Sequence, residues 1–281
     1  MIQIRYNLLA VILVVAGSGP AYAQSVGDIG VSATLVGTDL VDPVMWGANK
    51  TIRLWAELPS GWRLDAVAGN AASPMSIEVM GGSFYQDAFG GPTSRDMNPL
   101  LFPLAPSLEW DTFLTIGALT SVDNELSQIG MDWTDFEAGN SLAINNGSVF
   151  VVPTEPQGEL QAFTGSCGQA RSGVLIGQFT LLGEGASLMC SVLLQGKDES
   201  GAVWQQPIVD VLIDQDGHSN LAATIACAAD SDQSGVVDVL DLLSLLEAWG
   251  ETGCADISGD AIVGVDDLVL LIEAWGICVV E

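Results

Sequence analysis

The chain has 281 residues, 49% of them apolar, and a formal net charge of −28. A surface this acidic repels phosphate groups, so the composition argues against nucleic acid and against anionic membrane surfaces as partners. The apolar content is sufficient for a globular core, and 32 glycines with 11 prolines indicate many turns.

The first 23 residues have the pattern of a bacterial export signal, although a buried N-terminal helix is the alternative. Arg5 supplies a positive charge, and the nine-residue apolar stretch 8–16 is too short to span a bilayer. Residues 21–23 read AYA, a small-x-small cleavage site, and loss of Arg5 on cleavage changes the net charge from −28 to −29. We therefore expect a secreted, cell-surface or periplasmic protein with no transmembrane segment after cleavage.

Residues 24–222 are predicted to form one mainly β domain of the β-sandwich or jelly-roll type. Short alternating or apolar runs are separated by turn-rich stretches such as 90–99 and 138–148, which is typical of antiparallel sheets. The runs are residues 31–38, 51–58, 62–69, 111–119, 149–152, 174–182, 187–196 and 207–213. No part of this region keeps a helical period for a dozen residues.

The β region contains no recognisable catalytic motif. GxSxG, HExxH and P-loop patterns are absent, and His218, the single histidine, lies in a polar turn. A glycoside hydrolase with two paired carboxylates is the enzymatic alternative. Its candidate acids are Glu57, Asp65, Glu78, Glu109, Asp111, Asp132, Asp135 and Glu137. The tryptophans that could stack on sugar rings, or simply fill the core, are Trp46, Trp55, Trp62, Trp110, Trp133 and Trp204.

After a connector at residues 223–226, the composition changes. Residues 227–281 contain twelve acidic residues and no lysine or arginine, which marks a domain boundary. Within this tail, residues 230–250 and 256–276 are identical at ten of 21 aligned positions, with an offset of 26 residues. The tail is therefore an internal duplication.

Each copy begins with the spacing of a twelve-residue calcium loop, in which oxygen atoms come from positions 1, 3, 5, 7, 9 and 12. The first loop has the full set, namely Asp230, Asp232, Ser234, the Val236 carbonyl, Asp238 and Asp241. The second loop offers Asp256, Ser258, Asp260, the Ile262 carbonyl and Asp267. Gly264 at its position 9 has no side chain, so we expect weaker Ca²⁺ binding there. Val237, at position 8, is expected to pair with its counterpart in the other loop.

Each loop leads into one amphipathic helix. Leu242, Leu245, Leu246 and Trp249 share one face of the first helix, and Leu268, Leu271, Ile272 and Trp275 share the same face of the second. We expect both tryptophans to pack in a core between the helices. Gly250 and Gly276 are expected to cap the helix ends. No entering helix precedes either loop, so the motifs are half EF-hands.

The tail resembles a dockerin domain, in the variant form that has Cys residues flanking the repeats and AWG closing each helix. The resemblance covers about 55 residues and implies an all-α, calcium-stabilised module that docks onto a cohesin-like or other exported scaffold protein. In known dockerins, loop positions 10 and 11 help to select the cohesin, often through Ser or Thr. Here these positions are Val239–Leu240 and Val265–Asp266, so the identity of the partner does not follow from the resemblance.

The five cysteines are Cys167, Cys190, Cys227, Cys254 and Cys278. Export permits disulfides, and the last three bracket the repeats, so we expect at least one disulfide within the tail. Cys167 and Cys190 either pair with each other or are small buried residues. The sequence thus predicts an exported protein whose tail binds Ca²⁺ and docks a β-sandwich that binds a glycan or a protein. The alternative is a dockerin-bearing polysaccharide hydrolase.

Overall fold

The computed structural model describes residues 29–165, 170–214, 217, 229–231, 236–251, 255–258 and 262–277. The expected export signal at 1–23 and the connector at 223–226 lie outside these residues, as do His218 and four of the cysteines, Cys167, Cys227, Cys254 and Cys278. Among the described residues, no helix has both the length and the apolar character needed to cross a bilayer.

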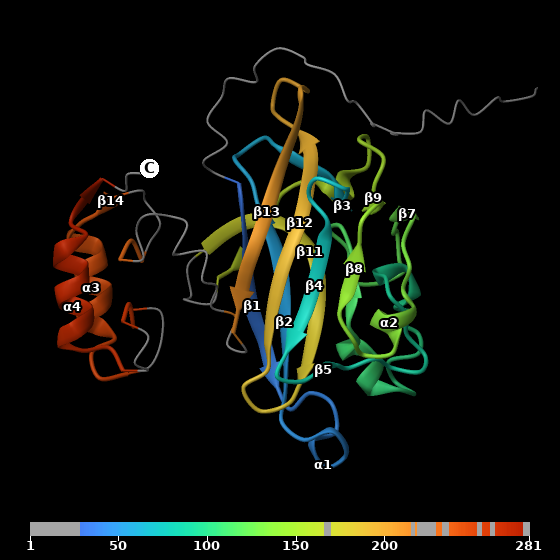
Figure 1. The fold of residues 1–281 in the computed structure, drawn as a ribbon, viewed down its shortest axis with the longest axis horizontal. Coiled ribbons are helices and arrows are strands. Elements are labelled where there is room, and N and C mark those ends of the chain that lie inside the picture. Colours follow the sequence, from blue (N-terminus) through green and yellow to red (C-terminus); the bar gives the residue numbers. More distant parts are fainter. Residues whose placement is uncertain are drawn as a thin grey trace, which may run out of the picture.

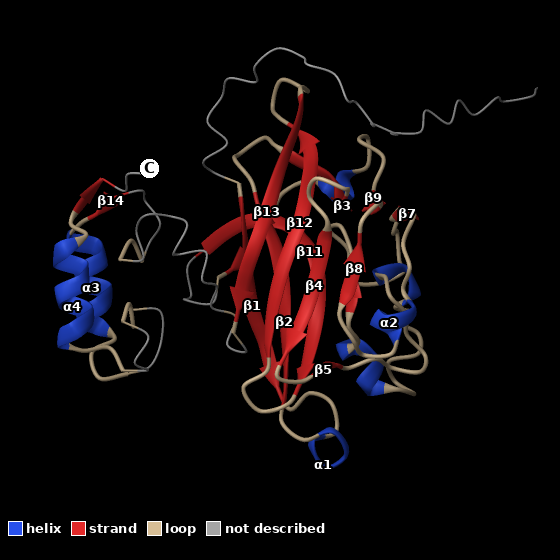
Figure 2. Ribbon diagram, viewed as in Figure 1, coloured by secondary structure: helices blue, strands red, loops and turns tan. Residues whose placement is uncertain are grey.

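The described chain is mainly β, and its strands pair antiparallel, as predicted (Figure 2). One sheet, here called sheet A, has the order β1-β2-β11-β10, with β5 and β6 also paired to β11. Its strands are β1 (Gly30–Thr38), β2 (Asn49–Glu57), β5 (Ser83–Phe84), β6 (Phe113–Leu114), β10 (Gln161–Thr164) and β11 (Ala170–Leu182).

The second sheet, sheet B, has the order β7-β9-β3-β12-β4-β8, with β13 paired to β12. Its strands are β3 (Arg63–Gly69), β4 (Met75–Met80), β7 (Ser127–Ile129), β8 (Leu142–Ile144), β9 (Gly147–Phe150), β12 (Ser187–Lys197) and β13 (Val203–Ile213). Short helical turns interrupt the loops, namely α1 (Pro43–Trp46), η1 (Ser94–Asp96), η2 (Pro106–Trp110), α2 (Thr134–Glu137) and η3 (Pro156–Gly158).

The two sheets share one hydrophobic core. Alternate residues of β2, such as Ile52 and Leu54, and alternate residues of β12, such as Leu188 and Leu194, are at most 1% exposed and belong to the same cluster. This is what a period of two residues produces when each sheet buries one face. Cys190 is a free thiol inside this core, so it is a small buried residue.

Strand β11 departs from alternation because both of its faces are covered. Ten consecutive residues from Gly173 onward are buried. On the outer face, Gln178 Nε2 donates to the carbonyls of Glu109 and Asp111, and Thr180 Oγ1 donates to the carbonyl of Trp110. The continuous apolar run in the sequence therefore reflects a central strand covered by η2.

Two sequence-based assignments in this region are wrong in part. Of the predicted strand at 111–119, only Phe113–Leu114 is a strand, because Thr115 Oγ1 bonds to the carbonyl of Ala118 at 2.6 Å within a turn. The stretch 138–148, predicted to be turn, contains β8, which pairs with β4.

The described part of the tail contains two helices of equal length, α3 (Val239–Glu247) and α4 (Val265–Glu273), which contact each other (Figure 1). The short strands β14 (Val236–Val237) and β15 (Gly276–Ile277) pair antiparallel. The helices end at Glu247 and Glu273 with Ala248 and Ala274 as C-caps. Gly250 and Gly276, the predicted caps, lie just beyond and adopt positive φ angles of 82° and 125°.

Candidate metal centre

Each tail loop is closed by the aspartate at its twelfth position. Asp241 and Asp267 are both fully buried. Asp241 Oδ1 accepts from Ser231 N at 2.7 Å, and its Oδ2 accepts from Asp238 N at 2.8 Å. One carboxylate therefore joins the start of the loop to the residue that begins the helix.

The second loop repeats this arrangement. Asp267 Oδ1 accepts from Ser258 N at 2.8 Å, and its Oδ2 accepts from Gly264 N at 2.6 Å. Burial is the largest single influence on this carboxyl and raises its pKa, but the backbone donors led by Ser258 and Gly264 outweigh it, so the pKa of Asp267 lies below its ordinary value. The charged form that a hard cation requires is favoured.

The residues at position 9 start the helices in different ways. Asp238 is the N-cap of α3, and its Oδ1 accepts from Leu240 N at 2.7 Å. Gly264 is the N-cap of α4 and makes no side-chain cap bond. A side-chain N-cap satisfies one of the free N–H groups of the first turn, so the first repeat has a contact that the second lacks.

The two repeats are interlocked through their position-8 valines, although not as predicted. Val237 pairs with Gly276, beyond the helix of the second repeat. Val263 accepts from Gly250 N and donates to Glu251 O, both at 2.9 Å, beyond the helix of the first repeat. Each loop thus pairs with the segment that follows the other repeat's helix, and the expected pairing of Val237 with Val263 is wrong.

The predicted core face of the helices is only half buried. Leu245 and Leu271 are 1% exposed, and Leu242 and Leu268 pack partly against the same small core. Trp249 and Trp275 are 43% and 49% exposed, so the prediction that they fill a core between the helices is wrong. Leu246 and Ile272 are also exposed, because the helices bury a narrower face than their apolar pattern indicates.

The structure places the predicted ligands as follows. Asp230 is buried, Val236 lies in β14, and Asp256 Oδ1 accepts from Ser258 Oγ at 3.2 Å. Asp232, Ser234 and Asp260 lie outside the described residues. Within the residues that are described, no three carboxylate, imidazole or thiol side chains surround a common metal position. The donors expected for both loops are oxygen atoms only, a chemistry that suits Ca²⁺ rather than Zn²⁺.

Ser231 is a functional residue that the loop spacing did not indicate. It lies at position 2, where no ligand is expected, yet both its N and its Oγ donate to Asp241 Oδ1. Its side chain therefore supports the closing carboxylate of the first loop. The equivalent residue of the second repeat is Ile257, which has no hydroxyl.

Comparison of the chain with protein-family models, curated proteins and solved structures finds no match.

The acids proposed for a hydrolase are dispersed among separate structural contacts. Glu57 pairs with Arg171, Asp65 pairs with Arg63, and Glu78 accepts from Ser76. Two pockets of the β region, of about 380 and 390 Å³, are lined by none of the eight candidates.

Asp111 is the most perturbed of these acids. Burial raises its pKa to about 8, and the charges of Glu137 and Asp87 add to the rise. Its two oxygens accept from Asp87 N at 2.7 Å and Gly91 N at 3.2 Å, so it anchors the loop after β5. Partial burial of the Glu137 carboxyl and the nearby charge of Asp96 raise the pKa of Glu137, although that residue as a whole is exposed.

The candidate tryptophans range from buried to exposed, and Trp62, Trp110 and Trp133 are intermediate. Trp55 and Trp204 are each only 9% exposed, whereas Trp46 is 41% exposed at the end of α1. Trp55 stacks on Phe163 with centroids 4.3 Å apart, and Trp62 lies against Trp204. The structure therefore indicates a packing role for most of the six tryptophans.

Proposed function

We propose that the tail is a dockerin-type module, whose two loops bind Ca²⁺ and whose helices dock an exported β-sandwich onto a cohesin-like or other scaffold protein. The observation that carries the proposal is the duplicated closure, in which Asp241 and Asp267 each accept from the start of a twelve-residue loop and from the N-cap of the helix that follows. This closure brings the start of each loop to the first turn of its helix, as a calcium cage requires.

In this proposal, Asp230, Asp232, Ser234, Asp238, Asp241 and the Val236 carbonyl hold the first ion. Asp256, Ser258, Asp260, Asp267 and the Ile262 carbonyl hold the second. The ion supplies electrostatic attraction that offsets the mutual repulsion of the loop carboxylates. The first site is the stronger, because Asp238 provides an oxygen at position 9 where Gly264 does not.

The docking surface of the proposal is the apolar stripe on each helix. On α3 the stripe consists of Val239, Leu243 and Leu246, and on α4 of Val265, Val269 and Ile272. All six side chains are between 46% and 64% exposed. The spacing i, i+4, i+7 places each set on one side of its helix. Exposed apolar stripes of this kind are typical of interaction surfaces.

Calcium titration of the full chain by calorimetry tests the metal part of the proposal. We expect binding that is removed by EDTA and weakened at least tenfold by Asp230→Ala. Glu247→Gln is the matched control, since it removes an exposed acid of α3 outside the loop. Equal weakening by both variants would show that general charge, rather than the loop, binds the ion.

Docking is tested separately with the immobilised full chain and an envelope extract of the producing cell. We expect calcium-dependent capture of one defined exported protein, reproduced with that protein after purification and weakened by Leu243→Asp, which places a charge in the stripe of α3. Calcium binding without any reproducible partner would leave the tail as a structural cap and contradict the docking role.

A further inference from the structure

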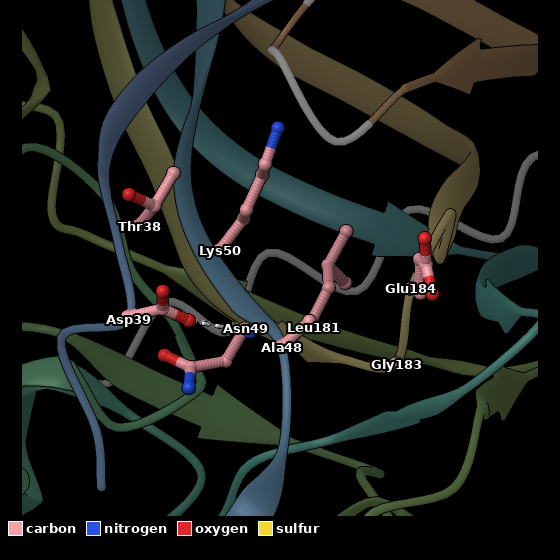
Figure 3. Close-up of a pocket in the computed structure, with 8 residues that line it drawn as sticks. All are labelled: Thr38, Asp39, Ala48, Asn49, Lys50, Leu181, Gly183 and Glu184. Atoms are coloured by element: carbon pink, nitrogen blue, oxygen red, sulfur yellow. Dashed lines mark hydrogen bonds between the residues drawn. The ribbon is translucent and has the colours of Figure 1, made fainter. Parts of the chain in front are cut away.

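A pocket of about 380 Å³ lies at one end of sheet A (Figure 3). Thr38, Lys50 and Leu181 line it and are register neighbours across β1, β2 and β11. Leu181 is 1% exposed and belongs to the shared core, so the floor of the pocket is the end of that core. Asp39 and Glu184, from the turns that follow β1 and β11, add two carboxylates to the lining.

Asp39 is held in a backbone conformation that few side chains adopt. Its φ is 54°, its N donates to Asn49 O at 2.8 Å, and its Oδ1 accepts from Asn49 N at 3.3 Å (Figure 3). Asn49 is 2% exposed, and its amide is committed to the backbone of Val41 and Gly47. These bonds hold the Asp39 turn in place at the edge of the pocket.

The lining leaves oxygen atoms available to a ligand. Among the described residues, Asp39 Oδ2, the Glu184 carboxylate and the Thr38 hydroxyl have no hydrogen-bond partner. Lys50 adds one positive charge against the two carboxylates. Carboxylates accept hydrogen bonds, and a hydroxyl both donates and accepts, so the set suits a ligand rich in hydroxyl groups. The excess of negative charge disfavours an anionic ligand.

We propose that this pocket is the ligand subsite of the β domain and that it takes one neutral, hydroxyl-rich sugar unit of a glycan. Sugar hydroxyls would donate to Asp39 Oδ2 and to Glu184. This inference rests on the sequence-based expectation that the β domain binds a glycan or a protein, and it is independent of calcium binding by the tail.

The test is titration of the full chain with neutral cello-, xylo-, manno- and chito-oligosaccharides, and with oligogalacturonate as the anionic comparison. We expect binding to at least one neutral series. Asp39→Asn and Glu184→Gln should each weaken it roughly tenfold or more, because each removes a charged acceptor. Asparagine tolerates positive φ, so Asp39→Asn keeps the turn.

Asp210→Asn is the matched control. Asp210 has a φ of 53°, close to that of Asp39, but it lies in β13 and outside the pocket. Unchanged affinity in Asp210→Asn beside the loss in Asp39→Asn supports the assignment. The proposal is overturned by failure of every neutral series, by preference for oligogalacturonate, or by equal affinity of Asp39→Asn and the unaltered chain. A chain that still binds Ca²⁺ but no sugar would overturn the pocket alone and leave the tail proposal standing.

Discussion

The two sheets and the helical tail reach stability by different means. The sheets enclose a large core that includes fully buried aromatic side chains such as Phe136 and Phe179. The described core of the tail is small and consists of Ala229, Val237, Leu245, Ala255, Val263 and Leu271. Units of this size bury too little apolar surface to be stable by burial alone, and they usually depend on metals or disulfides.

Buried polar groups show the same contrast. In sheet A, the hydroxyls of Thr51 and Thr180 pair at 2.7 Å beneath a covering segment and supplement a core that is already extensive. In the tail, the buried carboxylates of Asp241 and Asp267 are themselves what closes the loops. We infer that apolar burial dominates the stability of the sheets and loop closure that of the tail.

A cavity in the core of the sheets should destabilise the β domain strongly and leave the tail unaffected. Phe179→Ala should lower the free energy of unfolding of the β domain by about 3–5 kcal/mol, because it leaves a cavity under β11. The melting of the tail should not change. Differential scanning calorimetry of the full chain measures both transitions, and a common shift would show that the regions unfold as one cooperative unit.

Calcium removal is the converse experiment. At free Ca²⁺ 100-fold above its dissociation constant, binding to one site should stabilise the tail by about 2.7 kcal/mol. EDTA should therefore lower the melting temperature of the tail and leave that of the sheets unchanged. Calorimetry with and without EDTA measures this difference. A shift of the β transition alone would contradict the assignment of the metal to the tail.

Strand periodicity was sufficient to predict most of the sheets. Alternation in β1, β2 and β3 gave strands close to their observed bounds, since one face of each strand meets the core. Short strands such as β8 carry too few residues for a period, and pairing with β4 determines them. Most of the predicted strand at 111–119 is absent for a related reason. Side-chain bonds to the neighbouring backbone outweigh the local propensity to form a strand.

In the tail, spacing predicted the two helices, but it did not predict the hydrogen bonds by which Asp241 and Asp267 close the loops. Asp241 and Asp267 occupy the predicted position 12, yet their bonds to Ser231 and Ser258 depend on how each loop folds back. Apolar periodicity overestimated the core, because Trp249 and Trp275 fit the pattern without being covered. An exposed apolar residue and a buried one look alike in sequence.

The stability of the β domain should depend on pH through Asp111. The pKa of Asp111 is raised by burial to about 8, whereas an unfolded aspartate has a pKa of about 3.9. The folded domain therefore holds a proton that the unfolded chain releases. This stabilisation is complete below about pH 4 and is lost as the pH rises through 8, with a slope of at most about 1.4 kcal/mol per pH unit from this group.

Denaturant unfolding of the β domain between pH 5 and 9 measures this slope. Asp111→Asn should make the free energy of unfolding less dependent on pH, since the amide does not titrate. The substitution should also lower stability, because the amide no longer accepts from both Asp87 N and Gly91 N. An unchanged slope in Asp111→Asn would show that another group titrates. The stability of the calcium-bound tail should instead fall as the pH is lowered, because protons compete with Ca²⁺ for its carboxylates.

The smallest expected effect concerns two neighbouring leucines of α3. Leu246 is 49% exposed and Leu245 is 1% exposed. Leu246→Ala should change the unfolding free energy of the calcium-loaded tail by less than about 0.5 kcal/mol, because alanine favours helices and no buried contact is lost. Leu245→Ala, the matched control, should cost about 2–5 kcal/mol. Thermal unfolding followed by far-UV circular dichroism compares them, and a large loss in Leu246→Ala would mean that the stripe is covered within the chain. If Leu246→Ala also weakens docking while stability is kept, the exposed stripe serves the partner and the buried leucine serves the fold.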